Sequence, residues 1–304
     1  MSLLSAKSIE IDKFNGVYKD YMIAECCFVG VLGGTCTAYV IMQLLKRRKP
    51  YHIDTILCLI ATGVDFLISI GLMIRGLLCK FPYNTLAYHT KQLCPFEFLT
   101  VSFWTMAGAY CVGVMAMERY LLVVYNKHLP RYVWFSILAL AISIQFGLMC
   151  AVAGSGSLVL SNIAVSCVVG PNTPLEFFPK ASAVLYIITY IVTVYCYIGI
   201  MVTQCLRTIS NRKNLNISIS QTKREIIPII LRASLILILF TIGYGGKIYC
   251  WVWEWVTGKL RTWTMDYTAN MLLNLNSIFN LLIILYMNNE LKYSLLKKFN
   301  LKDF

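Results

Sequence analysis

The chain has 304 residues, of which 58% are hydrophobic and 13% are charged, and its formal net charge is +13. This apolar fraction exceeds what a soluble domain of this size can bury, so the composition excludes a soluble protein and indicates a polytopic protein in a lipid bilayer. The basic residues gather between apolar segments and form no mixed basic and aromatic surface. The positive-inside rule explains this distribution, and a nucleic-acid partner is not expected.

Seven apolar segments are each long enough to cross a bilayer, which takes about 20 helical residues. The segments cover residues 21–45, 53–77, 94–125, 132–154, 180–205, 226–253 and 265–287. Basic clusters follow the first, third, fifth and seventh segments, which predicts an amino terminus outside and a carboxyl terminus inside. The first residues are polar and mixed in charge, so we expect no cleavable signal peptide.

This pattern predicts an all-α fold with three parts. We expect an extracellular segment over residues 1–20, a seven-helix membrane bundle over 21–287 and a cytoplasmic tail over 288–304. Apolar residues recur at four-residue spacing among the lysines of the tail, which predicts a short amphipathic helix on the inner leaflet. The polar stretches 76–93 and 207–224 are predicted to be an outer loop and a basic cytoplasmic loop.

The third segment begins near Cys94 and carries the triplet Glu118-Arg119-Tyr120 close to its other end. Cys94 and Arg119 are 25 residues apart, roughly 37 Å along a helix, which covers the hydrocarbon core and part of each interface. An arginine is costly inside a bilayer, so Arg119 must lie at the membrane edge or face a polar partner. The simpler alternative is an interfacial anchor.

The second segment holds a carboxylate, Asp65, near its middle. We expect it to be the only acid within the membrane, and such an acid is functional by default because its burial is costly. It would line a polar cavity or an ion site. The alternative is a protonated acid that hydrogen-bonds between helices.

The last segment contains Asn276-Ser277-Ile278-Phe279-Asn280, and Cys167 lies in the loop after the fourth segment. Together with Cys94 and the Glu-Arg-Tyr triplet, these residues resemble the rhodopsin-like G-protein-coupled receptors, and the spacing of Cys94 and Arg119 matches that family. The resemblance implies a plasma-membrane receptor that passes an extracellular stimulus to a heterotrimeric G protein. It also implies a Cys94–Cys167 disulfide; two unpaired loop thiols are the alternative.

The resemblance assigns roles to further residues. At rest Arg119 would pair with Glu118 and with Glu225 on the sixth helix, and after activation Tyr197 would support the freed arginine. The implied activation switch comprises Glu118, Arg119, Tyr120, Tyr197, Glu225 and Asn280. A sodium- and water-filled cavity is implied at Asp65, Asn276 and Asn280.

Several positions depart from the family pattern. The proline and the tyrosine of the seventh-helix motif are replaced by Leu281 and Ile284. The sixth helix lacks the Cys-Trp-x-Pro motif and has Tyr244 in the place of the tryptophan. The glycines at 243, 245 and 246 weaken this helix and are predicted to act as its hinge. The chain is therefore similar to a divergent member with altered activation.

The ligand is predicted mainly by exclusion. Val101 stands where amine receptors carry an aspartate, and Asn274 stands where opsins carry the retinal-binding lysine, so an amine and retinal are both disfavoured. Glu97 occupies the place of the opsin counterion. It could pair with Lys247, or Lys247 could be an alternative retinal lysine, but a lysine that extends to the interface is the simpler interpretation. The expected ligand pocket comprises Glu97, Phe98, Val101, Tyr244, Lys247 and Asn274.

Two other functions remain open. A small transporter or channel could use Asp65 and Asn280 as part of an ion path, although the seven segments show no pair of related halves. A degenerate receptor could pair with another receptor without signalling itself. An enzyme is not expected, because the sequence shows no nucleophile-base set and no metal-ligand spacing.

Overall fold

The computed structural model describes residues 3–46, 52–80, 90–169, 177–215, 219–259 and 261–287. Over these residues the chain is almost entirely helical, and six helices are long and apolar enough to cross a membrane. The chain is therefore an all-α, multi-pass membrane protein, as predicted. The predicted amphipathic helix at 288–304 lies outside the described residues.

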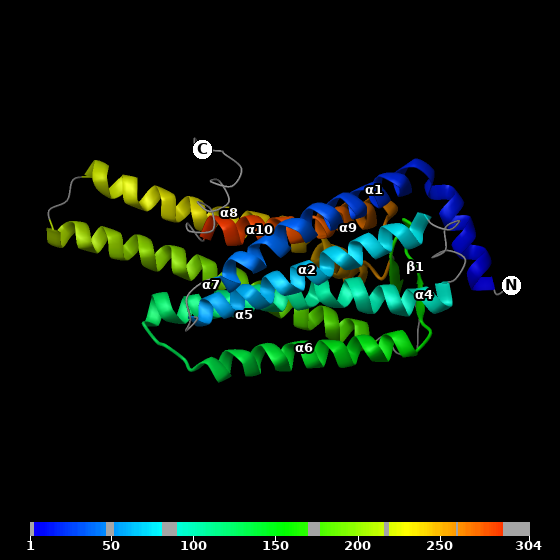
Figure 1. Cartoon of the computed structure of the whole chain (residues 1–304), viewed down its shortest axis with the longest axis horizontal. Helices are drawn as coiled ribbons and strands as arrows, with labels where there is room; N and C mark the ends of the chain where they lie inside the picture. The colour runs from blue at the N-terminus through cyan, green and yellow to red at the C-terminus, as the bar shows by residue number, and fades with distance from the viewer. Residues whose placement is uncertain are drawn as a thin grey trace.

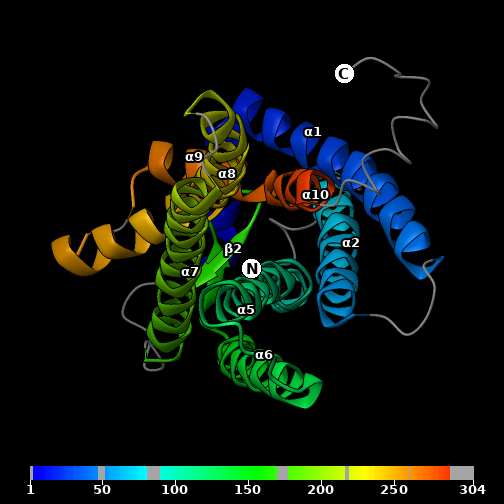
Figure 2. The same cartoon turned by 90° about the vertical axis from the view of Figure 1, so that its left-hand side faces the viewer.

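The long helices lie side by side along the long axis of the molecule (Figure 1). They are α1 (Leu3–Leu45), α2 (Ile53–Lys80), α5 (Phe103–Tyr125), α6 (Arg131–Gly154), α7 (Phe177–Leu215) and α8 (Ile219–Thr257). A short helix α4 (Thr90–Glu97) and a π-helical turn η1 (Phe98–Ser102) lead directly into α5. In the most apolar stretch of this α4–η1–α5 span, 72% of the residues are buried, whereas in the corresponding stretch of α6 only 22% are buried. Helix α5 therefore forms the centre of the bundle (Figure 2).

The bundle has two distinct ends. At one end lie the α5–α6 connection, residues 126–130, and the far tips of α7 and α8 (Figure 1). We call it the basic end, because lysines and arginines predominate in the sequence around these connections. At the other end lies a small hairpin of strands β1 (Leu158–Leu160) and β2 (Cys167–Val169), together with α4. We call it the disulfide end.

Several helices continue into the polar stretches beside the predicted membrane segments. Helix α1 begins at Leu3, within the predicted extracellular segment, and α2 continues to Lys80. Helices α7 and α8 have 39 residues each and cover most of the predicted loop at 207–224. The prediction was wrong there because polar residues indicate where a helix leaves the membrane but do not end it. At about 1.5 Å per residue each helix is roughly 58 Å long, well beyond the hydrocarbon core.

The last apolar segment is broken. It forms two helices of 12 residues, α9 (Trp263–Asn274) and α10 (Asn276–Met287), separated by Leu275. Neither helix alone is long enough to cross a bilayer. The carbonyl of Leu275 accepts hydrogen bonds from the backbone N–H groups of Ile278 and Phe279, each at 3.0 Å, so α10 starts anew at this point.

The hairpin was not predicted. Its strands pair antiparallel, with Leu158 opposite Val169 and Leu160 opposite Cys167. Cys167 forms a disulfide with Cys94 of α4, and this confirms the predicted bond. The two Cα atoms are 5.5 Å apart, a usual distance for a disulfide. The hairpin is therefore attached to the start of the central helix.

The glycines of α8 allow close packing. The helix continues through residues 243–246 without a break, and the role of these glycines as a hinge stays a prediction. A Cβ atom at Gly243 would lie 2.8 Å from Oδ1 of Asn276, and one at Gly246 would lie 3.3 Å from the backbone of Ala269. These glycines let α8 approach α9 and α10 closely.

We predict that Gly243→Ala lowers the thermal midpoint of the detergent-solubilised protein, because overpacking a tight contact costs about 1–3 kcal/mol. Gly147→Ala on α6 is the matched control, since a Cβ there meets nothing within 4 Å and alanine favours a helix. Size-exclusion recovery after heating measures both. Equal midpoints for the two variants would contradict the packing role of Gly243.

Candidate functional site

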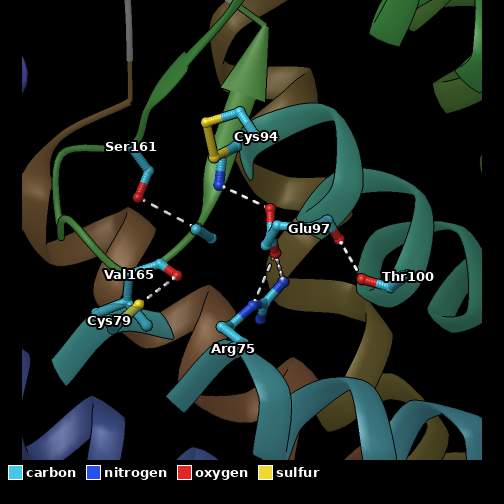
Figure 3. The surroundings of a disulfide bond; sticks show 9 residues. Arg75, Cys79, Cys94, Glu97, Thr100, Ser161 and Val165 are labelled. Atoms are coloured by element: carbon cyan, nitrogen blue, oxygen red, sulfur yellow. Dashed lines mark hydrogen bonds and ion pairs between the residues drawn. A yellow bond between two sulfur atoms is a disulfide. The ribbon is translucent and has the colours of Figure 1, made fainter. Parts of the chain in front are cut away.

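A buried arginine organises the disulfide end. Arg75 of α2 is only 5% exposed, and its guanidinium donates from Nε and Nη2 to Oε1 of Glu97, with the Nε bond at 2.8 Å. Its Nη1 donates to Oδ1 of Asn274 at 3.3 Å. Figure 3 shows Arg75 and Glu97 pointing toward each other beneath the disulfide. Arg75 thus joins α2, α4 and α9.

Glu97 has two partners. Oε1 accepts from Arg75, and Oε2 accepts from the backbone N–H of Cys167 at 3.1 Å. The Glu97–Lys247 pair, which the sequence left open as an alternative, is therefore not formed. Lys247 instead lies among the charges of the α8–α9 connection, which include Glu254, Arg261 and Asp266. The sequence contains a signal for the true partner, since Arg75 is the one basic residue within the apolar stretch 53–77.

Other expected pocket residues also lie in the packed interior. Phe98 is partly buried, Val101 is 3% exposed, and Tyr244 is fully buried. The hydroxyl of Tyr244 accepts a hydrogen bond from Nδ2 of Asn276. Of the six expected pocket residues, the structure links Glu97 and Asn274 through Arg75, while Tyr244 belongs to a separate polar group around Asn276.

Asp65 lies opposite the seventh segment. Its Oδ1 accepts from Nδ2 of Asn280 at 3.0 Å, and both residues are almost completely buried. We expected Asp65 to be the only acid within the membrane. In the structure, however, Glu97 and Asp266 are buried as well, and each is 1% exposed. Glu97 was expected in the ligand pocket, whereas Asp266, near the start of α9, was not predicted.

Several oxygens near Asp65 lack a protein partner within the described residues. They are Oδ2 of Asp65, Oδ1 of Asn276, Oγ of Ser277 and Oδ1 of Asn280. Buried polar atoms without partners usually bind water or an ion. Carboxylate, amide and hydroxyl oxygens are the donors that hard cations such as sodium accept. The side chains therefore fit the sodium ion that the family resemblance implies.

A cavity of about 40 Å³ connects this region with Arg119. Its lining includes Asp65 and Asn280 at one end and Asp54, Arg119 and Tyr197 at the other. About 10–15 Å³ of such space holds one water molecule, so the cavity has room for a few. The polar centre of the bundle and the arginine of the triplet thus line one cavity with room for water.

Arg119 pairs with a residue that was not predicted. Its Nε and Nη2 donate to Oδ1 of Asp54, at 3.0 and 2.7 Å. The expected partners were Glu118, which is buried at 6% exposure, and Glu225, whose side chain lies outside the described residues. Asp54 precedes Asp65 by 11 residues, about three helical turns, so both carboxylates lie on one face of α2. This spacing is the signal that could have identified Asp54.

The two tyrosines of the expected switch lie apart. Tyr197 of α7 is 4% exposed and lines the cavity beside Arg119. Tyr120 points toward α7, where its hydroxyl lies 3.2 Å from the hydroxyl of Tyr195 and its ring covers Gly199. Of these two tyrosines, Tyr197 therefore lines the cavity and already forms a side-chain hydrogen bond with Arg119.

No protein-family model matches the chain, and no curated protein is significantly similar to it in sequence. Its function must therefore be argued from the residues and their geometry.

We predict an energetic coupling between Asp54 and Arg119. Asp54→Asn and Arg119→Gln should each lower the thermal midpoint by roughly 3 °C, and the double variant by little more, because either change alone already removes the ion pair. The exposed pair Lys80–Asp20, with side chains 49% and 58% exposed, is the matched control and should show almost no coupling. Strictly additive losses at Asp54 and Arg119 would contradict the contact.

We also predict that sodium chloride raises the thermal midpoint relative to an equal concentration of choline chloride, because an ion that binds only the folded protein stabilises it. Asp65→Asn should abolish this difference, since it removes the one carboxylate among the four oxygens named above. Ser69→Ala, which changes a neighbour whose hydroxyl bonds only the backbone of Asp65, should retain it. A sodium effect that persists in Asp65→Asn would argue against this site.

Proposed function

We propose that this chain is a divergent rhodopsin-like G-protein-coupled receptor. The observation that carries the proposal is the arrangement along the central helix. The disulfide of Cys94 attaches a loop to one end, and Arg119 lies 25 residues later at the other end, in a cavity that continues to Asp65. A structural anchor would need only an interfacial arginine. An arginine paired inside a hydrated cavity suits a switch.

We propose seven membrane crossings, the six long helices and a seventh made of α9 and α10 together. The extracellular side would be the disulfide end, because disulfides persist in oxidising compartments. The cytoplasmic side would be the basic end, in agreement with the positive-inside rule. An amino terminus outside, a carboxyl terminus inside and a plasma-membrane location follow from this orientation.

The proposed switch has two states that differ in the partner of Arg119. In the resting state the guanidinium is held by Asp54 of α2. In the active state the side chain leaves Asp54, Tyr197 stabilises its new position, and the basic ends of α7 and α8 separate to admit a segment of the G protein. An extracellular stimulus and the G protein would each favour the second state by binding it more tightly.

A transporter or channel would need a path that continues from the cavity to the disulfide end. In the described residues, the side chains between Asp65 and that end are held in the Arg75–Glu97–Asn274 contacts and in the Tyr244–Asn276 bond. This arrangement favours the receptor over an ion path.

We predict that wild-type protein in cells activates at least one member of a panel of G-protein biosensors without added ligand, and that Arg119→Ala at matched surface expression abolishes the signal. Asp54→Asn should increase the signal, because it releases Arg119. If the wild type and both variants were silent, and ion currents or substrate uptake were found that require Asp65, a transporter would replace the receptor as the proposed function. Silence in both types of assay would favour a non-signalling receptor.

A further inference from the structure

The tip of the loop at the disulfide end, residues 161–166, is buried as deeply as the helices. Ile163 is 2% exposed, and Ala164 and Val165 are each 1% exposed. These three residues belong to the same apolar core as the side chains of α2, α5 and α8. Only Asn162 in this segment faces solvent. A surface loop of a membrane protein would expose most of its residues, so this one occupies interior space.

Three hydrogen bonds within the tip close it on itself. The N–H of Ser161 donates to the carbonyl of Ser166 at 2.8 Å, and the N–H of Ala164 donates to the carbonyl of Ser161 at 3.0 Å. The hydroxyl of Ser166 donates to that of Ser161 at 3.1 Å. Ala164 adopts a positive φ of 59°, which closes the turn. The segment is therefore a preformed compact plug, and we call residues 161–166 the loop plug.

The loop plug contacts several elements of the bundle. The carbonyl of Val165 accepts from the thiol of Cys79 at the end of α2, at 3.4 Å (Figure 3). Nδ2 of Asn162 donates to the carbonyl of Arg261 in the α8–α9 connection, at 3.3 Å. The next residue, Cys167, is bonded to Cys94 and donates its N–H to Glu97. Helices α2, α4, α8 and α9 are thus all linked at the plug.

Below the plug, polar contacts continue toward Arg119. Glu97 holds Arg75, and Arg75 holds Asn274, the last residue of α9. Immediately beyond the break at Leu275, Asn276 donates to Tyr244, and one turn later Asn280 donates to Asp65 at the cavity. A displacement of the plug would therefore act first on Glu97 and Arg75, and then on the helix that carries Asn280.

We propose that the loop plug is the resident ligand of the outer pocket, an apolar Ile-Ala-Val occupant supplied by the chain itself, and that its seated position favours the resting state. This inference rests on the receptor function proposed above. The seated plug and the Asp54–Arg119 pair occur together in one structure. For this reason we assign the seated plug to the resting state. An extracellular stimulus would act by displacing the plug, because the seated plug is held beside Glu97 through Cys167.

The seated position can be tested without any signalling assay. In intact cells, a membrane-impermeant maleimide should label Ile163→Cys about tenfold more slowly than Asn162→Cys, because residue 163 must first be exposed by local opening. Wild-type protein gives the background, and Glu97→Gln, which weakens the support beneath Cys167, should accelerate labelling of Ile163→Cys. Equally fast labelling of the two single cysteines would overturn the proposal.

A second experiment tests whether the seated plug favours the resting state. It measures the basal signalling of the double variant Ile163→Ser/Val165→Ser, which retains the disulfide but makes the buried tip polar. We expect a severalfold increase over wild type, with Asn162→Ser as the matched exposed control. An unchanged or reduced signal at equal surface expression would overturn the resting-state assignment. Slow labelling of Ile163→Cys combined with silence of every variant, Asp54→Asn included, would support the seated plug and count against the receptor function.

Discussion

The burial of Arg75 is the constraint on which the disulfide end depends. A guanidinium inside an apolar bundle is stable only if its charge and its donors are matched. Glu97 supplies the charge, and Asn274 supplies a further acceptor, so α2, α4 and α9 must meet at one point. Because Glu97 also accepts the N–H of Cys167, the position of the hairpin depends on the same charge pair. Removing either charge would leave the other buried alone, which makes this point sensitive to substitution of a single residue.

Polar side chains form a discontinuous series from this point to the opposite end. The series passes the break at Leu275, where α9 ends and α10 begins, and reaches the cavity that Asp65 shares with Arg119. A continuous seventh helix would have rigidly coupled Asn274 to Asn280. The break instead lets the two halves shift relative to each other, and the unpartnered oxygens beside it can exchange protein, water and ion contacts at small cost. The combination of a break and unsatisfied oxygens suits a region with two arrangements.

Much of the fold could be predicted from the sequence, because apolar segments of bilayer length and a pair of cysteines leave few alternatives. The disulfide and the long helices follow from such patterns. The partner of Arg119 could not be predicted from such patterns, because pairing between helices depends on the rotation of each helix about its axis. Asp54 also lies in the first turn of α2, where an acid is not unusual. The close packing at Gly243 was not predicted, because a glycine that permits bending and one that permits close approach look the same in a sequence. The burial of the hairpin tip was not predicted, since the serines that mark it as polar bond to each other within the loop.

The unusual length of α8 has a mechanical consequence. The helix is tightly packed at Gly243, where the side chain of Asn276 leaves no room for a larger residue, while its other end extends far beyond α5 and α6 (Figure 1). Such a contact acts as a fulcrum, and the remaining length acts as the long arm of a lever. From Gly243 to Ile219 the helix measures roughly 36 Å, so a tilt of about 5° at the fulcrum moves the tip by about 3 Å. A rearrangement of a few tenths of an ångström around Asn276 would thereby be converted into a much larger movement of the helix tip.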